Sequence, residues 1–80
     1  MTPSSTDDRL QYLGEALGVA GAVLVALPSS LARAAGFAVW IAANAAWIAS
    51  GRRAENPHIA RLFSAYLITA VVGLWGAWAA

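Results

Sequence analysis

Hydrophobic residues fall into three long blocks along the chain, separated by short polar segments. The block from Leu10 to Leu27 contains one charged residue, Glu15, and the blocks 34–50 and 62–80 contain none. At a rise of about 1.5 Å per residue, each block can span most or all of a hydrocarbon layer about 30 Å thick. The pattern therefore predicts an all-α membrane protein with three transmembrane helices, at about residues 8–27, 31–50 and 57–79.

Turn-forming residues lie between the blocks and predict where the helices end. Pro28 is followed by two serines and indicates a tight turn after the first helix. Gly51 is expected to cap the end of the second helix. Asn56 is expected to cap the start of the third, with Pro57 at its first position. With a short polar tail at residues 1–8, the whole chain is expected to form one three-helix domain.

Composition favours the membrane over water. The chain has 80 residues, of which 60% are hydrophobic and 11% are charged, so it has too little polar surface to cover a soluble core. A tightly packed soluble bundle of alanine-rich helices is the weaker alternative. Trp75 and Trp78 near the end of the chain support the membrane, because their rings favour its interface.

Several function classes are disfavoured by the residues that the chain lacks. It contains no cysteine and one histidine, and it has neither metal-ligand spacing nor a glycine-rich phosphate loop. We therefore expect no enzymatic activity, no metal and no other cofactor. The net charge of +1 is too small to indicate a nucleic-acid partner.

The arginines predict an orientation in the membrane. In a chain with three crossings, Arg9 and the arginines of the second loop, Arg52, Arg53 and Arg61, share one side, and only Arg33 lies on the other. The positive-inside rule then places the N-terminus and the second loop in the cytoplasm and the C-terminus outside. We expect a multi-pass protein of the cell inner (cytoplasmic) membrane, with the three loop arginines contacting lipid phosphates.

Small residues recur at helical spacing in all three blocks. Small side chains let membrane helices approach closely, which is their main source of packing energy. We therefore expect the helices to pack through these residues: Gly14, Gly18 and Ala22 in the first helix, Ala35, Ala38, Ala42, Ala45 and Ala49 in the second, and Ala65, Thr69, Gly73 and Ala77 in the third.

The second helix also carries a polar residue between two tryptophans, in the order Trp40, Asn44 and Trp47. An amide in hydrocarbon costs free energy unless it is paired, so Asn44 should face protein or water. One interpretation is a hydrogen bond between helices that fixes their register. The other is the wall of a solute pocket, to which Tyr66 and Thr69 of the third helix could add hydroxyl groups.

Glu15 is the other candidate polar site. It lies within the first helix, about a turn and a half from its expected start. The simpler interpretation is a carboxylate that reaches the interface and pairs with Arg9 or a loop arginine. The alternative is a buried carboxylate that couples proton movement to transport.

The order of these signals resembles a known family. A glycine-rich first helix ending in LP precedes the run GFAVWIAANAAWIASG and a third helix ending in GLWGAW. This order is similar to the small three-helix membrane proteins of bacteria and their phages related to the SemiSWEET and nicotinamide riboside transporter group. The resemblance implies a three-helix unit, and SemiSWEETs pair two such units around a central solute path.

Two features depart from the SemiSWEET pattern. SemiSWEETs carry Pro-Gln in the first helix, whereas Pro28 is followed here by Ser29. Their pocket asparagine is expected on the third helix, whereas Asn44 is on the second. The resemblance therefore does not imply a sugar as the solute.

Two functions from different classes remain open. The first is a half-transporter-like unit that forms a homodimer or small homo-oligomer around a path for a small polar solute. That path would be lined by Trp40, Asn44 and Trp47, with Tyr66 opposite. The alternative is an accessory subunit that docks on a larger membrane complex, and a holin-like pore former is a third, weaker option. Membrane lipids are expected partners in every case.

Overall fold

The structure is a computed structural model that describes residues 5–79, with side chains from residue 8 onward. The chain folds into three helices, α1 (Ser5–Ala26), α2 (Ser30–Arg53) and α3 (Pro57–Ala79). The prediction of an all-α protein with three helices is confirmed. Within the predicted polar tail, residues 5–8 already belong to α1, and residues 1–4 lie outside the described residues.

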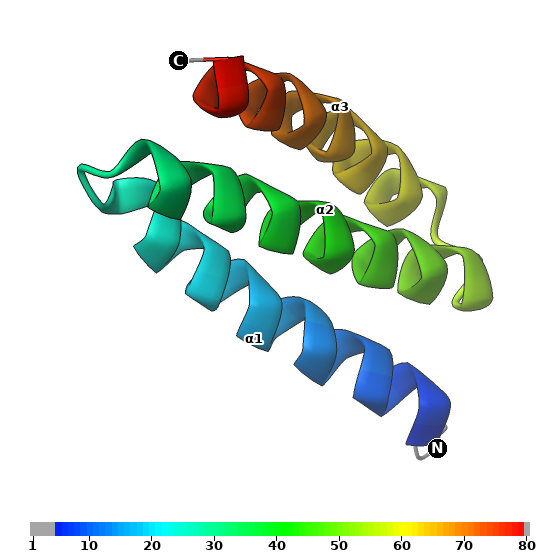
Figure 1. Ribbon diagram of the computed structural model, residues 1–80. Helices are drawn as coiled ribbons and strands as arrows, with labels where there is room; N and C mark the ends of the chain where they lie inside the picture. The colour runs from blue at the N-terminus through cyan, green and yellow to red at the C-terminus, as the bar shows by residue number, and fades with distance from the viewer. Residues whose placement is uncertain (1–4, 80) are drawn as a thin grey trace.

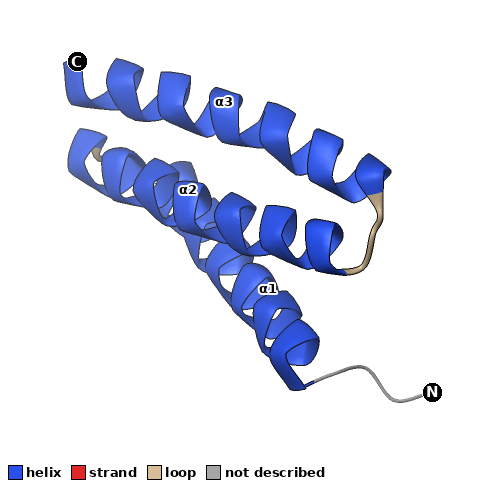
Figure 2. Ribbon diagram, turned by 90° about the vertical axis from the view of Figure 1, so that its right-hand side faces the viewer, coloured by secondary structure: helices blue, strands red, loops and turns tan. Residues whose placement is uncertain are grey.

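The three helices form a single layer with α2 in the middle (Figure 1). Both α1 and α3 pack on α2, and over the described residues they make no contact with each other. The backbone extends over 47 × 20 × 13 Å, so its thinnest dimension is close to the diameter of one helix. Figure 2 shows that α3 runs alongside α2, whereas α1 crosses it more steeply. Both faces of the layer are therefore open.

The helices differ in how well they suit a membrane. By length and composition, α2 and α3 are long and apolar enough to cross one, and in the described chain they are the two helices that meet this criterion. The first half of α1 instead carries Asp7, Asp8, Arg9 and Glu15. Two possible spans are thus established, and a crossing by α1 stays a prediction.

The buried and exposed side chains are arranged as lipid would require. The buried apolar side chains of the described chain are alanines, at positions 34, 43, 46 and 70. Large apolar side chains point outward instead, for example Val72, Trp75 and Trp78 of α3. Small residues inside and large ones outside are typical of helices that pack against one another in a bilayer.

The first connection is a short turn that ends in a helix cap. The hydroxyl of Ser29 accepts a hydrogen bond from the backbone N–H of Ala32 at 3.2 Å. The carbonyl of Ser29 accepts from the N–H of Arg33 at 2.9 Å, which opens the α-helical ladder. The predicted turn after Pro28 is present, and it leads directly into α2.

The second connection corrects the prediction for Gly51. Helix α2 continues through Gly51 to Arg53, and Glu55 follows in the left-handed region with a φ of 55°. The N–H of Asn56 bonds to the carbonyl of Gly51 at 2.8 Å, and the N–H of Glu55 bonds to that of Arg52 at 3.2 Å. This is a Schellman motif in which Glu55 stands where glycine is usual.

Gly51 serves helix packing instead of capping. A Cβ atom at this position would lie 3.0 Å from the backbone nitrogen of Ala60 and 2.9 Å from the Cγ2 of Ile59. The missing side chain therefore lets α2 and α3 approach closely beside their loop. The prediction for Asn56 is confirmed, because its Oδ1 accepts from the N–H of Ile59 at 3.2 Å and α3 begins at Pro57.

Candidate functional site

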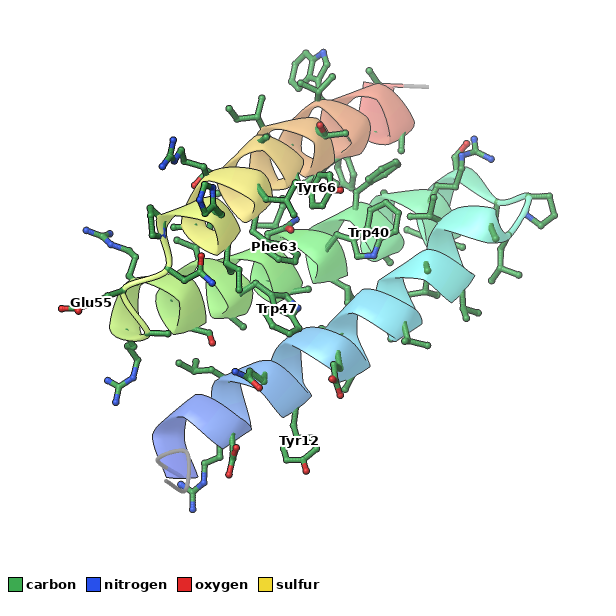
Figure 3. The ribbon with its side chains drawn as sticks, turned by 180° about the vertical axis from the view of Figure 1, so that it is seen from behind. Tyr12, Trp40, Trp47, Glu55, Phe63 and Tyr66 are labelled. Atoms are coloured by element: carbon green, nitrogen blue, oxygen red, sulfur yellow. The ribbon has the colours of Figure 1, made fainter. Side chains whose placement is uncertain are left out.

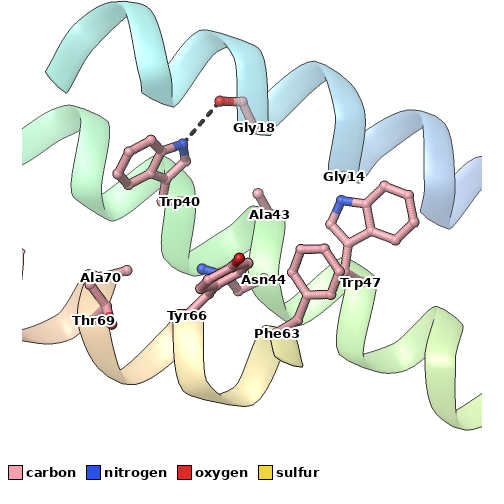
Figure 4. A pocket seen from close by; sticks show the side chains of 10 residues that line it. All are labelled: Gly14, Gly18, Trp40, Ala43, Asn44, Trp47, Phe63, Tyr66, Thr69 and Ala70. Atoms are coloured by element: carbon pink, nitrogen blue, oxygen red, sulfur yellow. Dashed lines mark hydrogen bonds between the residues drawn. The ribbon is translucent and has the colours of Figure 1, made fainter. Parts of the chain in front are cut away.

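One open face of the helix layer holds a pocket with a volume of about 360 Å³ (Figure 4). Residues of α2 form its floor, and residues of α1 and α3 form its two sides. Because α1 and α3 do not touch each other, they leave this space between them. The lining residues are Gly14, Gly18, Trp40, Ala43, Asn44, Trp47, Phe63, Tyr66, Thr69 and Ala70.

The side toward α1 pairs tryptophans of α2 with glycines. The indole N–H of Trp40 donates a hydrogen bond of 2.9 Å to the backbone carbonyl of Gly18 (Figure 4). The indole of Trp47 lies where a side chain at Gly14 would be. The ring of Trp40 lies in the same way where a side chain at Gly21 would be.

The side toward α3 is built from stacked rings (Figure 3). The rings of Trp47 and Phe63 stack at a centroid distance of 5.2 Å and an interplanar angle of 12°. Phe63 in turn meets the ring of Tyr66 edge to face at 5.6 Å. These contacts are the favoured geometries for aromatic pairs, and they place three rings in sequence along the pocket.

Asn44 lies on the pocket floor with an unpaired amide. Asn44 is 7% exposed, and its side chain makes no hydrogen bond within the described residues. Over residues 8–79, every fully enclosed side-chain nitrogen or oxygen has a partner. The amide of Asn44 is therefore not fully sealed in the protein, and it borders the pocket.

The two hydroxyl groups of the pocket differ in availability. The hydroxyl of Thr69 donates to the carbonyl of Ala65, one turn earlier on α3, at 3.2 Å. The hydroxyl of Tyr66 makes no such bond with any described residue, and this side chain is half exposed. Asn44, Tyr66 and Trp47, whose indole N–H makes no hydrogen bond within the described residues, are thus the lining side chains that offer free hydrogen-bonding groups.

The structure brings most of the predicted site residues together. Trp40, Asn44, Trp47 and Tyr66 all line the pocket, whereas Glu15 lies outside it, exposed on α1. Phe63 also lines the pocket, although it was not among the predicted residues. Its position three residues before Tyr66, on the same face of a helix, was the available signal.

The predicted packing residues divide into two groups. Gly14 lies against Trp47, and Gly73 lies against the ring of Phe37, so both are at helix contacts. Gly18 contributes its carbonyl, while the space beside its Cα is open.

The alanine stripe of α2 requires a correction. Ala38, Ala42 and Ala45 lie on an exposed side of the helix. Because α2 sits between two neighbours, its contacts use positions on two sides, and the stripe lies between them. The buried positions of α2 are Ala34, Gly36, Ala43, Asn44, Ala46, Ser50 and Gly51.

The basic residues lie at the two ends of the layer. Arg52, Arg53 and Arg61 are exposed around the second loop, where the Nε of Arg61 donates to the carbonyl of Pro57 at 3.3 Å. Arg33 lies at the opposite end, and its guanidinium donates to the hydroxyl of Ser30 at 3.2 Å. This distribution agrees with the arginine pattern used to predict orientation, and contact with lipid phosphates stays a prediction.

The described residues contain no group of three or more His, Asp or Glu side chains placed to hold a metal ion. What the pocket offers is aromatic surface, one free amide, and the free hydroxyl and indole N–H of two of its rings, which suits binding of a small molecule.

No protein-family model, no curated protein and no solved structure matches this chain. The similarity to the SemiSWEET and nicotinamide riboside transporter group therefore stays a prediction from the sequence.

Proposed function

We propose that the chain is a small multi-pass protein of the cytoplasmic membrane and one unit of a homo-oligomer that surrounds a path for a small polar solute. The observation that carries this proposal is the pocket, to which all three helices contribute and in which the amide of Asn44 has no partner. A buried amide without a partner is costly, so its retention is best explained by something that binds there.

Three crossings are supported by the arrangement of the helices. Helix α1 has 22 residues, about 33 Å at 1.5 Å per residue, and it lies against α2. The N-terminal end of α1 and the loop between α2 and α3 lie at the same end of the layer (Figure 1). Arg9 thus lies at the same end of the layer as Arg52 and Arg53. Because arginines are enriched on the cytoplasmic side, this favours a cytoplasmic location for this end.

A second copy is needed to complete a path. A single layer of helices leaves the pocket open to its surroundings on one face. A twofold arrangement of two such layers, face to face, would enclose the pockets between them and shield the amides of Asn44 from lipid. A homodimer is the simplest assembly of this kind.

The alternative, an accessory subunit of a larger membrane complex, is favoured by a different observation. No helix of this chain covers the exposed alanines Ala38, Ala42 and Ala45 over the described residues. Small residues allow another membrane helix to approach closely. In this second function, a partner protein would dock on the alanine side of α2.

The mass of the complex extracted in native lipid particles tests both functions. We expect a homodimer or another small homo-oligomer, and the variant Asn44→Ala should keep that mass while losing solute uptake. Recovery only together with a different, larger membrane protein would contradict the proposal and favour the accessory subunit. Ser64→Ala is a suitable control, because the hydroxyl of Ser64 lies outside the pocket and bonds to Ala60 of its own helix.

A further inference from the structure

We infer that the pocket binds a neutral, planar ring compound whose edge carries a hydrogen-bond donor next to an acceptor, as a lactam does. This inference rests on the proposed function in one respect, since it takes the same pocket as the solute site. It goes further by naming the chemical class of the ligand.

The lining of the pocket argues for a neutral ligand. None of the residues around it carries a charge, and the nearby carboxylate of Glu15, next to Gly14 in the chain, is exposed outside it. An ion placed in an apolar site between membrane helices needs an opposite charge or many polar partners. One amide, one phenol and one indole N–H do not supply these, and the attraction of a cation to the aromatic faces is too weak to replace them, so an ionic ligand is disfavoured.

The walls argue for a flat ligand of small size. Trp40, Trp47, Phe63 and Tyr66 present aromatic surface, which favours stacked or edge-to-face contact with another ring. The volume of about 360 Å³ is at the lower end of the range of about 300–1,000 Å³ found for small-molecule sites. A compound of one or two rings fits this description.

The amide of Asn44 indicates which hydrogen-bonding groups the edge of the ligand carries. A carboxamide offers two N–H donors and a carbonyl acceptor side by side, and in Asn44 all of them are free within the described residues. A lactam edge presents the complementary acceptor and donor at the same spacing and satisfies both groups of the amide together. A lipid acyl chain satisfies neither. A sugar carries more hydroxyl groups than the few free polar groups of the lining can pair with.

The space that such a ring would occupy is open on the α1 side. A Cβ atom added at Gly18 would meet no other atom within 4 Å, although Gly18 lines the pocket. A larger side chain at this position would therefore grow into open space rather than into a neighbouring helix. Gly76 of α3 is equally open but lies outside the pocket, so it provides a matched position for a control.

The chain offers a direct reporter for this interaction. It contains two asparagines, Asn44 in the pocket and Asn56 at the cap of α3. Selective ¹⁵N labelling of asparagine in the full chain, held in lipid nanodiscs, gives one side-chain amide signal set inside the pocket and one outside it. The probes are 2-quinolone, a neutral two-ring lactam; naphthalene, which has the same shape without the amide; and N-methylquinolinium, a cation of the same size.

We expect 2-quinolone to shift the amide signals of Asn44 in a saturable way and to leave those of Asn56 unchanged. Naphthalene and N-methylquinolinium should bind at least about tenfold more weakly, because neither pairs with the amide. Equal or tighter binding of either compound, or no shift of Asn44 with 2-quinolone, would overturn the inference. If 2-quinolone causes no shift of the Asn44 signals, the amide is already hydrogen-bonded to another protein group or to water.

Two pairs of variants separate loss of binding from loss of structure. Gly18→Leu should abolish binding of 2-quinolone in equilibrium dialysis, while Gly76→Leu should not change it. Asn44→Leu, which keeps a similar side-chain volume, should weaken binding about tenfold or more, while Ser64→Ala should leave it unchanged. Unchanged binding in both Gly18→Leu and Asn44→Leu would contradict the inference.

The two proposals fail in different ways. Binding of 2-quinolone by a chain that is recovered only with a larger membrane protein would support the ligand class and refute the homo-oligomeric transporter. A homo-oligomer in which no probe moves the signals of Asn44 would refute the ligand class and leave the proposed assembly intact.

Discussion

The two outer helices, α1 and α3, are held against α2 in different ways. On the α1 side, backbone approaches backbone: a Cβ atom at Gly36 would lie 2.8 Å from the nitrogen of Val25 and 2.9 Å from the carbonyl oxygen of Gly21. A hydrogen bond between helices, from Trp40 to Gly18, adds to this contact. On the α3 side, the backbones approach closely beside the loop, at Gly51, and rings fill much of the remaining space, with Phe63 stacked on Trp47 and Phe37 against Gly73.

This difference matches the polarity of the two helices. Helix α3 is apolar enough to cross a membrane by itself. Packing of rings, which tolerates small shifts, is therefore sufficient to hold it against α2. Helix α1 is not, because its first half is charged. It therefore depends on specific contacts with α2, and these contacts are made by glycines that leave no room for a side chain. We conclude that α1 is the helix whose position is most easily disturbed.

The largest expected effect is on the α1 contact. Gly36→Ala places a methyl group against the backbone of α1, which cannot move without separating the helices. We expect a loss of about 1–3 kcal/mol in the free energy of unfolding, typical of overpacked sites. Cross-linking between cysteines introduced into α1 and α2 should fall, while cross-linking between α2 and α3 should stay unchanged.

Two glycine variants serve as comparisons for Gly36→Ala. At Gly73 the added methyl meets the side chain of Phe37, which can shift, so Gly73→Ala should cost less than Gly36→Ala. At Gly18 the added methyl meets nothing, so Gly18→Ala should leave stability unchanged or raise it by up to about 1 kcal/mol through helix propensity. Equal losses of unfolding free energy in all three variants would show that the contact between α1 and α2 is no more sensitive to an added methyl group than the other two sites.

The sequence predicted the helices better than their contacts. Periodicity and turn residues located all three helices, because long apolar blocks and the residues around Pro28 and Pro57 act locally. The prediction that Gly51 caps the second helix was wrong, because a glycine near a helix end suits a close helix contact as well as a cap. Only the neighbouring helix, at Ile59 and Ala60, decides between them.

The pocket was predicted only in part, because its residues can be recognised locally but the packing of α2 cannot. Trp40, Asn44 and Trp47 stand out in an alanine-rich helix, and the structure places all three at one site. Which side of α2 packs could not be read from its alanines, since small residues occur all around it. That choice depends on α1 and α3 binding to two sides of α2 at once, which is a property of the assembled layer.

A smaller effect tests the hydrogen bond on the α1 side. Trp40→Phe keeps an aromatic ring and removes the N–H that donates to Gly18. Because hydrogen bonds between membrane helices contribute modestly, we expect a loss of about 1 kcal/mol or less. Steric trapping in bicelles measures this change, and an unaltered unfolding free energy would show that the bond does not hold α1.

The smallest effect concerns the loop that joins α2 to α3. Glu55 has a φ of 55°, a conformation that costs most residues about 1 kcal/mol and glycine almost nothing. Glu55→Gly should therefore stabilise the chain by up to about 1 kcal/mol without affecting α1. Glu55→Gln removes the same charge but keeps a side chain, so an equal gain in this variant would show that charge rather than φ is responsible.

The position of α1 in the membrane is the most direct test of the account. The chain has no cysteine, so single cysteines can be labelled from either side of the membrane with an impermeant maleimide. We predict that Thr2→Cys and Ala54→Cys react only from the cytoplasmic side, and that Ser30→Cys and Ala79→Cys react only from outside. Reaction of Thr2→Cys on the same side as Ser30→Cys would show that α1 does not cross, and it would contradict the three-helix membrane unit.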